Sequence, residues 1–173
     1  MKRTVIKFGL ISGAISSVMM VATLPFMDRI GFDNSEIFGY TTIVLSCLLI
    51  FFGIRSYRDA NGGTISFGRA FKVGILITLI SCTCYVITWE ILYNTVMRDF
   101  MVKYAAYMVE QAKKSGAAPA AVEAQLQQIE RMKTLYQNPF FNVALSFIEP
   151  FPIGLIVSLV SSAILRRRQV PQQ

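Results

Sequence analysis

The sequence contains no histidine, and only 16% of its 173 residues are charged. The absence of histidine excludes a Ser-His-Asp triad, a histidine-ligated metal site and a histidine proton relay. The acidic residues form no metal-ligand motif, and no serine–lysine pair shares one apolar environment. We therefore predict no catalytic residues, no metal ligands and no cofactor, and we predict that the protein is not an enzyme.

Cysteine is also scarce, and all three cysteines, Cys47, Cys82 and Cys84, lie in apolar segments. Cys82 and Cys84 are two positions apart, which places them on different sides of a helix. This spacing disfavours an intrahelical disulfide or a two-thiolate metal clip. We interpret the three thiols as small buried hydrophobic side chains.

Apolar residues are abundant instead. They make up 54% of the sequence, and the mean hydropathy of +0.51 is well above that of soluble domains. The length accommodates about four membrane spans of ~20 residues each and leaves no room for a separate catalytic domain. We predict an all-α fold: an integral membrane four-helix bundle that forms one domain over residues 1–173 and contacts the lipid bilayer.

Four apolar segments are long enough to cross the ~30 Å hydrocarbon layer as helices. They cover residues 8–27, 37–54, 73–93 and 140–165. We expect the acidic residues 28–36 to form the turn between the first two spans. The fourth segment contains Glu149-Pro150-Phe151-Pro152, so we expect its helix to be bent or frayed at the start.

Basic residues gather in the N-terminal tail, the connection between spans two and three, and the C-terminal tail. They are Lys2, Arg3, Lys7, Arg55, Arg58, Arg69, Lys72 and Arg166 to Arg168. A four-span arrangement places all three groups on one side, and cytoplasmic segments of membrane proteins carry an excess of lysine and arginine. We predict a multi-pass membrane protein with both termini in the cytoplasm. Since this topology accounts for the net charge of +7, we predict no nucleic-acid partner.

The third connection, residues 98–138, would face the periplasm or the exterior. Apolar residues recur at three- and four-residue steps on either side of Ser115-Gly116-Ala117-Ala118-Pro119, a sequence that ends one helix and begins another. The first stripe comprises Tyr93, Met97, Phe100, Tyr104 and Tyr107, and the second comprises Val122, Leu126, Ile129, Met132 and Tyr136. We predict an extramembrane helical hairpin between spans three and four, with the two stripes packed together.

The second connection contains an amphipathic stretch over residues 66–74, in which Phe67, Ala70 and Phe71 share one side. We expect a short separate helix that starts near Ser66 and lies at the membrane interface, before the chain turns into span three.

Several segments together resemble a known family. They are residues 9–13 in the first span, residues 53–58 at the end of the second, residues 62–74, the long helical third connection, and residues 154–158 before the basic tail. In this combination the chain resembles the domain of unknown function 4199 family of small bacterial inner-membrane proteins over almost its whole length. The most specific part is residues 53–74. The resemblance implies the architecture and a location in the bacterial inner membrane, and it carries no activity or catalytic residues.

Glu90 and Glu149 are acids in otherwise apolar segments, where ionisable residues commonly have a function. Counting from Lys72 and from Arg166 at 1.5 Å per residue places both acids roughly 25 Å from the cytoplasmic side, near the outer interface. They could form a carboxylate pair, a polar cap on the bundle, or solvated helix-end acids. A broken helix beside Glu149 would also free backbone carbonyls that could bind a cation.

Small residues recur at four-residue steps on two of the predicted spans. They are Gly9 and Gly13, with Ser12 and Ser16 overlapping them, and Gly154 and Ser158. Small residues on one helix face let backbones approach closely in a membrane. We interpret them as helix-packing positions, within the bundle or between two copies of the chain.

These features favour a non-enzymatic structural or interaction component of the membrane, which associates with a second copy or with another membrane protein. The alternative is a small proton- or cation-coupled transporter that uses Glu90 and Glu149. Neither half of the chain shows a broken helix at the midplane, and four spans leave little room for a substrate path. A dimer would restore that room.

Overall fold

The computed structural model describes residues 1–116 and 118–167, and the regular elements in them are helical apart from one isolated β-bridge. In chain order the elements are α1 (Lys2–Thr23), the short 3-10 helix η1 (Leu24–Phe26), α2 (Met27–Asp59), α3 (Phe67–Thr95), α4 (Phe100–Lys114), α5 (Pro119–Tyr136), α6 (Pro139–Ile148) and α7 (Pro150–Leu165). The predicted all-α class is confirmed.

Four stretches are long and apolar enough to cross a membrane. They are Lys2–Phe26, Ile37–Asp59, Phe67–Thr95 and Pro139–Leu165. The four predicted spans are therefore confirmed. Most of the helices are longer than the apolar segments from which they were predicted. The added residues are mostly basic or polar positions at the ends, which remain helical beyond the apolar segment.

Two sequence expectations about the connections were wrong. Residues 28–36 are not a turn but belong to α2, whose helical backbone is interrupted at Gly31 with φ of 73°. Glycine tolerates this left-handed conformation, so the bend needs no loop. Residues 66–74 do not form a separate interfacial helix either, because α3 runs without a break from Phe67.

The fourth span is divided into α6 and α7 at Glu149, as the prolines predicted. Pro150 has no N–H to donate to the carbonyl four residues earlier, and its ring crowds that carbonyl. It is therefore placed where proline is best tolerated, in the first turn of α7.

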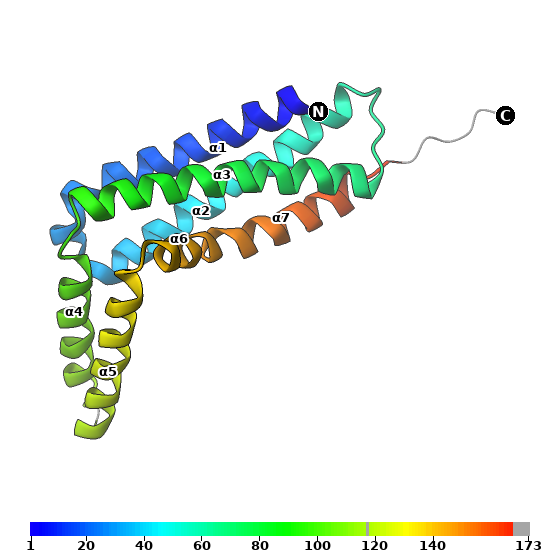
Figure 1. Ribbon diagram of the computed structural model, residues 1–173. Helices are drawn as coiled ribbons and strands as arrows, with labels where there is room; N and C mark the ends of the chain where they lie inside the picture. Colours follow the sequence, from blue (N-terminus) through cyan, green and yellow to red (C-terminus); the bar gives the residue numbers. More distant parts are fainter. Residues whose placement is uncertain (117, 168–173) are drawn as a thin grey trace. The chain divides into compact units, whose positions relative to one another are not determined.

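The chain divides into two compact units. The first unit comprises Met1–Ile87 and the chain from Phe147, and the second comprises Thr88–Ser146. In the first unit, α1 lies along α2 and α2 along α7, and Figure 1 shows these helices and α3 running lengthwise together. The start of α1, the α2–α3 connection and the end of α7 lie at the same end.

An apolar core holds that end of the first unit together. Its buried members are Val5, Ile43, Cys47, Ile50, Ile54, Ile65, Ala70, Val73, Ile77 and Leu165. Ala70, Val73 and Ile77 have no exposed surface, and their three- and four-residue spacing puts them on one face of α3. This continuous buried face explains why α3 begins at Phe67 rather than after a separate interfacial helix.

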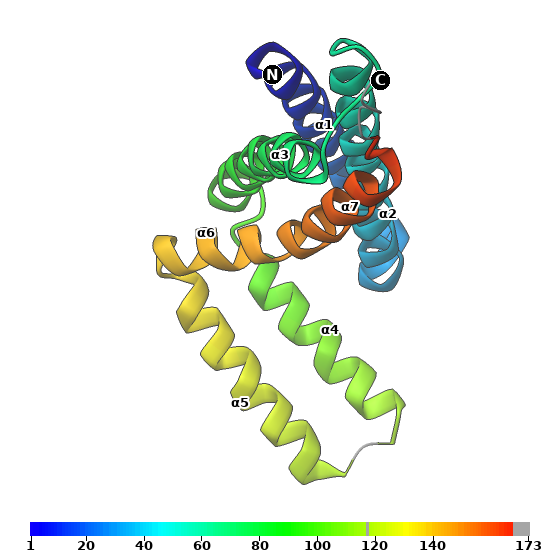
Figure 2. The same ribbon diagram turned by 90° about the vertical axis from the view of Figure 1, so that its right-hand side faces the viewer.

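The second unit contains the α4–α5 hairpin, which Figure 2 shows as two neighbouring helices. Gly116 has φ of 69° and follows the last turn of α4, a common way to end a helix, and Pro119 occupies the first turn of α5. Met101, Ala112 and Ile129 are buried. The predicted hairpin between spans three and four is confirmed.

Candidate functional site

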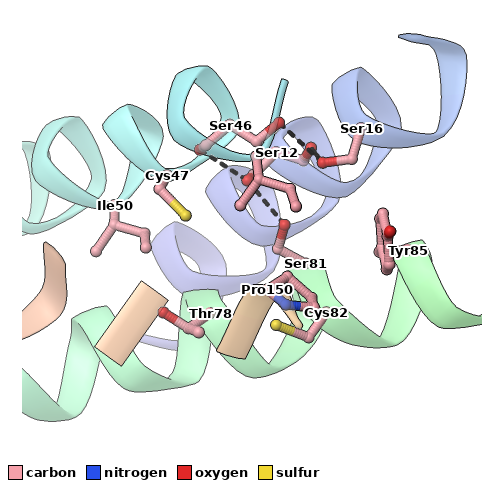
Figure 3. A pocket seen from close by; sticks show the side chains of 11 residues that line it. Ser12, Ser16, Ser46, Cys47, Ile50, Thr78, Ser81, Cys82, Tyr85 and Pro150 are labelled. Carbon is pink, nitrogen blue, oxygen red and sulfur yellow. Dashed lines mark hydrogen bonds between the residues drawn. The ribbon is translucent and has the colours of Figure 1, made fainter. Parts of the chain in front are cut away.

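Four serines from three helices of the first unit meet in a hydroxyl cluster, which we define as Ser12 and Ser16 of α1, Ser46 of α2 and Ser81 of α3. The Ser12 hydroxyl donates to the Ser46 carbonyl at 2.9 Å and lies 2.9 Å from the Ser81 hydroxyl. The Ser16 hydroxyl lies 2.8 Å from the Ser46 hydroxyl, to which it donates. Figure 3 shows these side chains pointing toward one another. The cluster therefore joins α1 to both α2 and α3.

Gly9 and Gly13 let α1 come close enough to α3 for these contacts. A Cβ atom at Gly9 would lie 2.8 Å from the Cβ of Ile80, and one at Gly13 would lie 2.5 Å from the Cβ of Cys84. Both separations are shorter than van der Waals contact, so a larger residue would push the helices apart. The two glycines thus face α3 of the same chain.

Gly154 and Ser158 occupy the corresponding position between α7 and α3. A Cβ atom at Gly154 would collide with the Thr78 side chain, and Ser158 lies against Gly74. The Thr78 hydroxyl lies 3.1 Å from the Ser158 hydroxyl and 3.3 Å from the Gly154 carbonyl oxygen. Small residues and a shared hydroxyl contact therefore occur together at this helix pair as well.

The hydroxyl cluster lines a cavity of about 20 Å³. The other lining residues are Ile43, Cys47, Ile50, Thr78, Cys82, Tyr85 and Pro150. A cavity of this size can hold about one water molecule where hydroxyl groups line it, since roughly 10–15 Å³ is the minimum. Cys47 and Cys82 are free thiols at its edge. The cavity is too small for an organic substrate.

The hydroxyl protons of the cluster can be assigned in a consistent way. When Ser12 donates to the Ser46 carbonyl, Ser81 must donate to Ser12, and Ser16 donates to the Ser46 hydroxyl. Within residues 1–116 and 118–167, the Ser46 hydroxyl accepts a bond and has no acceptor for its own proton. A water molecule in the cavity would accept that proton.

Glu149 lies in the first unit, at the break between α6 and α7. The Tyr85 hydroxyl donates to its Oε2 at 3.0 Å, and Tyr85 also lines the cavity. The Glu149 side chain is exposed. Tyr85 thus connects an exposed carboxylate to the edge of the polar interior.

Glu90 lies in the second unit, on the last part of α3. Its Oε2 accepts a bond from the Asn94 side chain at 3.3 Å, while Oε1 is buried with no hydrogen-bond partner among the described residues. Each of the two predicted acids therefore has its own contact, with Asn94 for Glu90 and Tyr85 for Glu149.

The second unit has a polar centre that the sequence analysis did not identify. Asn142 of α6 is 1% exposed, and its Oδ1 accepts bonds from the Trp89 indole and the Ser146 hydroxyl, both at 3.3 Å. Ser46, Ser81 and Thr78 were missed in the same way. The single signal in the sequence was their position inside apolar segments, which many lipid-facing serines and threonines share.

Comparison with known proteins gives one family. A family model described as "Protein of unknown function (DUF4199)" matches residues 7–167. No curated protein and no solved structure matches the chain.

Proposed function

The chain belongs to the DUF4199 family, and from that premise we propose that it is a non-enzymatic structural or interaction component of the membrane. The observation that supports this most is the use of its polar interior. The hydroxyls of Ser12, Ser16 and Thr78 contact other helices of the same unit, and they line a cavity with room for about one water molecule. Such an interior serves to hold helices together, and this cavity is too small to serve as a path for a solute.

We propose further that the protein lies in a bacterial inner membrane with both termini in the cytoplasm. The support is that the three predicted basic groups lie at one end of the first unit, as Figure 1 shows for the segments that carry them. Arg168, a member of the third group, lies outside the described residues. Reporter fusions after Gly62 and after Arg168 should both report the cytoplasm, and a fusion at Gly116 should report the periplasm. A periplasmic signal from the C-terminal fusion would contradict this topology.

The partner of such a component would be a second copy or another membrane protein. Purification of the full chain in a mild detergent, followed by mass measurement of the intact particle, distinguishes the two. A multiple of 19.4 kDa indicates self-association, and an added mass indicates a different partner.

The alternative, a small proton- or cation-coupled transporter, is supported by one specific arrangement. Glu149 lies at a helix break and contacts Tyr85, which reaches the cavity. Vesicles that contain the protein and an internal pH indicator test it under an imposed gradient, with Glu90→Gln, Glu149→Gln and the double variant. Glu123→Gln, an exposed acid on α5, is the matched control.

The two functions predict opposite patterns. A transporter loses flux in the Gln variants and keeps its melting temperature in detergent. A structural component shows no flux in any version, and its Gln variants lose stability or membrane accumulation, whereas Glu123→Gln changes neither.

A further inference from the structure

One end of the first unit carries nine cationic side chains and one acid among the described residues. The cations are Lys2, Arg3, Lys7, Arg55, Arg58, Arg69, Lys72, Arg166 and Arg167, and the acid is Asp59. We call this set the basic end. It comprises the start of α1, the end of α2, the start of α3 and the residues after α7, which Figure 1 shows together.

The apolar core confirms that these segments converge. Val5 of α1, Ile54 of α2, Ala70 of α3 and Leu165 of α7 belong to the same buried cluster. Each lies within a few residues of a cation of the basic end. The charges are therefore arranged around a common core.

Few of these charges are neutralised by the protein itself. Asp59 lies 2.8 Å from Arg58 and 3.8 Å from Arg55. The other seven cations have no acidic partner among the side chains that the structure describes, and they are exposed. Like charges gathered in this way repel one another unless anions from outside the chain lie between them.

A backbone contact fixes the C-terminal cations to this end. The Ile65 N–H donates to the Arg167 carbonyl, and the Arg167 N–H donates to the Ile65 carbonyl, both at 3.0 Å. Ile65 is 3% exposed and Leu165 is 4% exposed, so both sides of this β-bridge are anchored in the core. The bridge therefore holds Arg166 and Arg167 beside the α2–α3 connection.

Aromatic side chains at the start of α3 place the basic end at the level of lipid headgroups. Phe67 and Phe71 stack with ring centroids 6.3 Å apart, and Phe67 is 40% exposed. Arg69 and Lys72 are exposed on the same turns of the helix. Aromatic residues beside cations at the end of a span are typical of the membrane interface.

We propose that the basic end is a binding site for the phosphate groups of anionic phospholipids, and that the Ile65–Arg167 bridge preorganises it. The four spans bring this end to a layer of phosphate-bearing headgroups, which supplies the anions that the chain lacks. Clusters of four to eight lysines and arginines next to a span characteristically attract anionic lipids. Free phosphate would meet the same cations without the local concentration that the membrane provides.

The test measures the melting temperature and lipid retention of the full-length protein in neutral detergent. The additives are phosphatidylglycerol, phosphatidylcholine and inorganic phosphate. Phosphatidylglycerol alone should raise the melting temperature and remain bound in native mass spectrometry, and 0.5 M salt should weaken both effects. An equal response to phosphatidylcholine, or a full response to inorganic phosphate, would overturn the proposal.

Charge removal supplies the matched variants. Arg166→Gln with Arg167→Gln should weaken phosphatidylglycerol binding about tenfold or more, since each cation near a membrane contributes on the order of 1 kcal/mol. Arg131→Gln with Lys133→Gln removes the same charge from α5 and should leave binding unchanged. Equal losses in the two variants would mean that net charge, and not this site, attracts the lipid.

The bridge is tested at a single position. Arg167→Gln removes one charge and keeps the backbone bonds, whereas Arg167→Pro also removes the N–H that bonds to Ile65. Arg166 has ψ of 127°, a conformation that a following proline favours. The proline variant should bind phosphatidylglycerol several-fold more weakly than the glutamine variant, with the same melting temperature before lipid is added. Equal binding by the two variants would overturn the role of the bridge.

Discussion

In the first unit, several serine and threonine hydroxyls join one helix to another, whereas in the second unit aromatic rings from different helices lie against one another. Trp89 lies 5.4 Å from Phe100, and Tyr93 lies 5.9 Å from Tyr136, measured between ring centroids. The ion pairs Lys103–Asp99, Lys114–Glu110 and Lys133–Glu130 join residues only three or four positions apart. The first unit instead brings α1 against α3 at Gly9 and Gly13, where a Cβ would not fit.

The difference in contact type follows from the environment of each region, which would be lipid for the membrane-spanning helices and water for the hairpin. Between helices in lipid there is no gain from hiding apolar surface, so close packing at small residues and interhelical hydrogen bonds must hold them together. A hairpin in water gains from burying aromatic surface, and its polar side chains can bond to solvent. The contact types thus agree with a first unit in lipid and with a hairpin whose aromatic side chains pack against the end of α3 outside the lipid.

The sequence supplies a separate probe for each unit. Trp89 is the only tryptophan and lies in the second unit, while all three cysteines lie in the first. Tryptophan fluorescence therefore reports on the second unit, and alkylation of the buried Cys47 and Cys82 reports on opening of the first. The predictions below use these two signals.

Gly13→Leu should have the largest effect. The new side chain would enter the space of Cys84, and forced overpacking costs about 3 kcal/mol. We expect faster alkylation of Cys47 and Cys82 and an unchanged Trp89 spectrum. Gly39→Leu is the control, because no atom lies within 4 Å of a Cβ at Gly39. Equal alkylation rates in the two variants would show that α1 does not depend on close contact with α3.

Ile129→Asp should cost about 2 kcal/mol or more, since it puts a charge at a position that is 6% exposed. We expect faster proteolysis near Gly116 and a shifted Trp89 spectrum, with no change in cysteine alkylation. Leu126→Asp should cost less, because Leu126 is 39% exposed although it belongs to the same predicted stripe. If Leu126→Asp were the more damaging change, the hairpin would pack on another face.

Ser12→Ala should cost about 1 kcal/mol, the usual value for an interhelical hydrogen bond in a membrane. Ser12 contacts both Ser46 and Ser81, so α1 loses its polar contacts with two helices. Thr83→Ala removes a hydroxyl that bonds only to the Leu79 carbonyl of its own helix, and it should be close to neutral. The two variants are compared by thermal unfolding, with cysteine alkylation as the signal. An equal loss of stability in both would show that the hydroxyl cluster does not stabilise the fold.

Acid should have the smallest effect, confined to α4. Lys103 and Lys114 donate hydrogen bonds to Asp99 and Glu110, which lowers the pKa of each carboxyl below its ordinary value. A lowered folded-state pKa gives stability that is present above the ordinary carboxyl pKa near 4 and is lost as the pH falls through the lowered one. The amide hydrogen-exchange rates of residues 100–114 should therefore rise slightly below pH 4, after correction for the intrinsic exchange rate at each pH.

Lys103→Gln with Lys114→Gln is the variant for this measurement. It should already show the faster exchange of α4 at neutral pH and respond less to acid. An identical acid response in the variant would attribute the change to other groups.

Much of the fold could be predicted from the sequence, because span length and hydropathy depend on segments of twenty or more residues. The α4–α5 hairpin was equally accessible, since Gly116 and Pro119 act through local backbone conformation. The prediction of a separate helix near Ser66 was wrong, because the amphipathic periodicity of these residues also fits the first turns of a longer helix. Ala70 continues the buried face of Val73 and Ile77, and that continuity depends on what packs against it.

The hydroxyl cluster could not be predicted, because a hydroxyl in an apolar helix can form its hydrogen bond in two ways, either to a carbonyl of its own helix or to another helix. Thr41 and Thr83 bond to carbonyls of their own helix and remain exposed, whereas Ser12 and Ser46 bond between helices. Both solutions satisfy the hydroxyl group. Which one a residue adopts depends on the rotation of its helix in the bundle, and that is set by contacts far apart in the sequence.

The β-bridge between Ile65 and Arg167 also sets an order of events during synthesis. Ile65 leaves the ribosome before α3 is complete, but its partner follows the last span, so the two backbone bonds can form only after α7 has been inserted. Until then the N–H and carbonyl of Ile65 must bond to water or headgroups. The bridge is thus a marker of completed insertion, and protection of the Ile65 amide would distinguish a finished chain from one arrested before its final span.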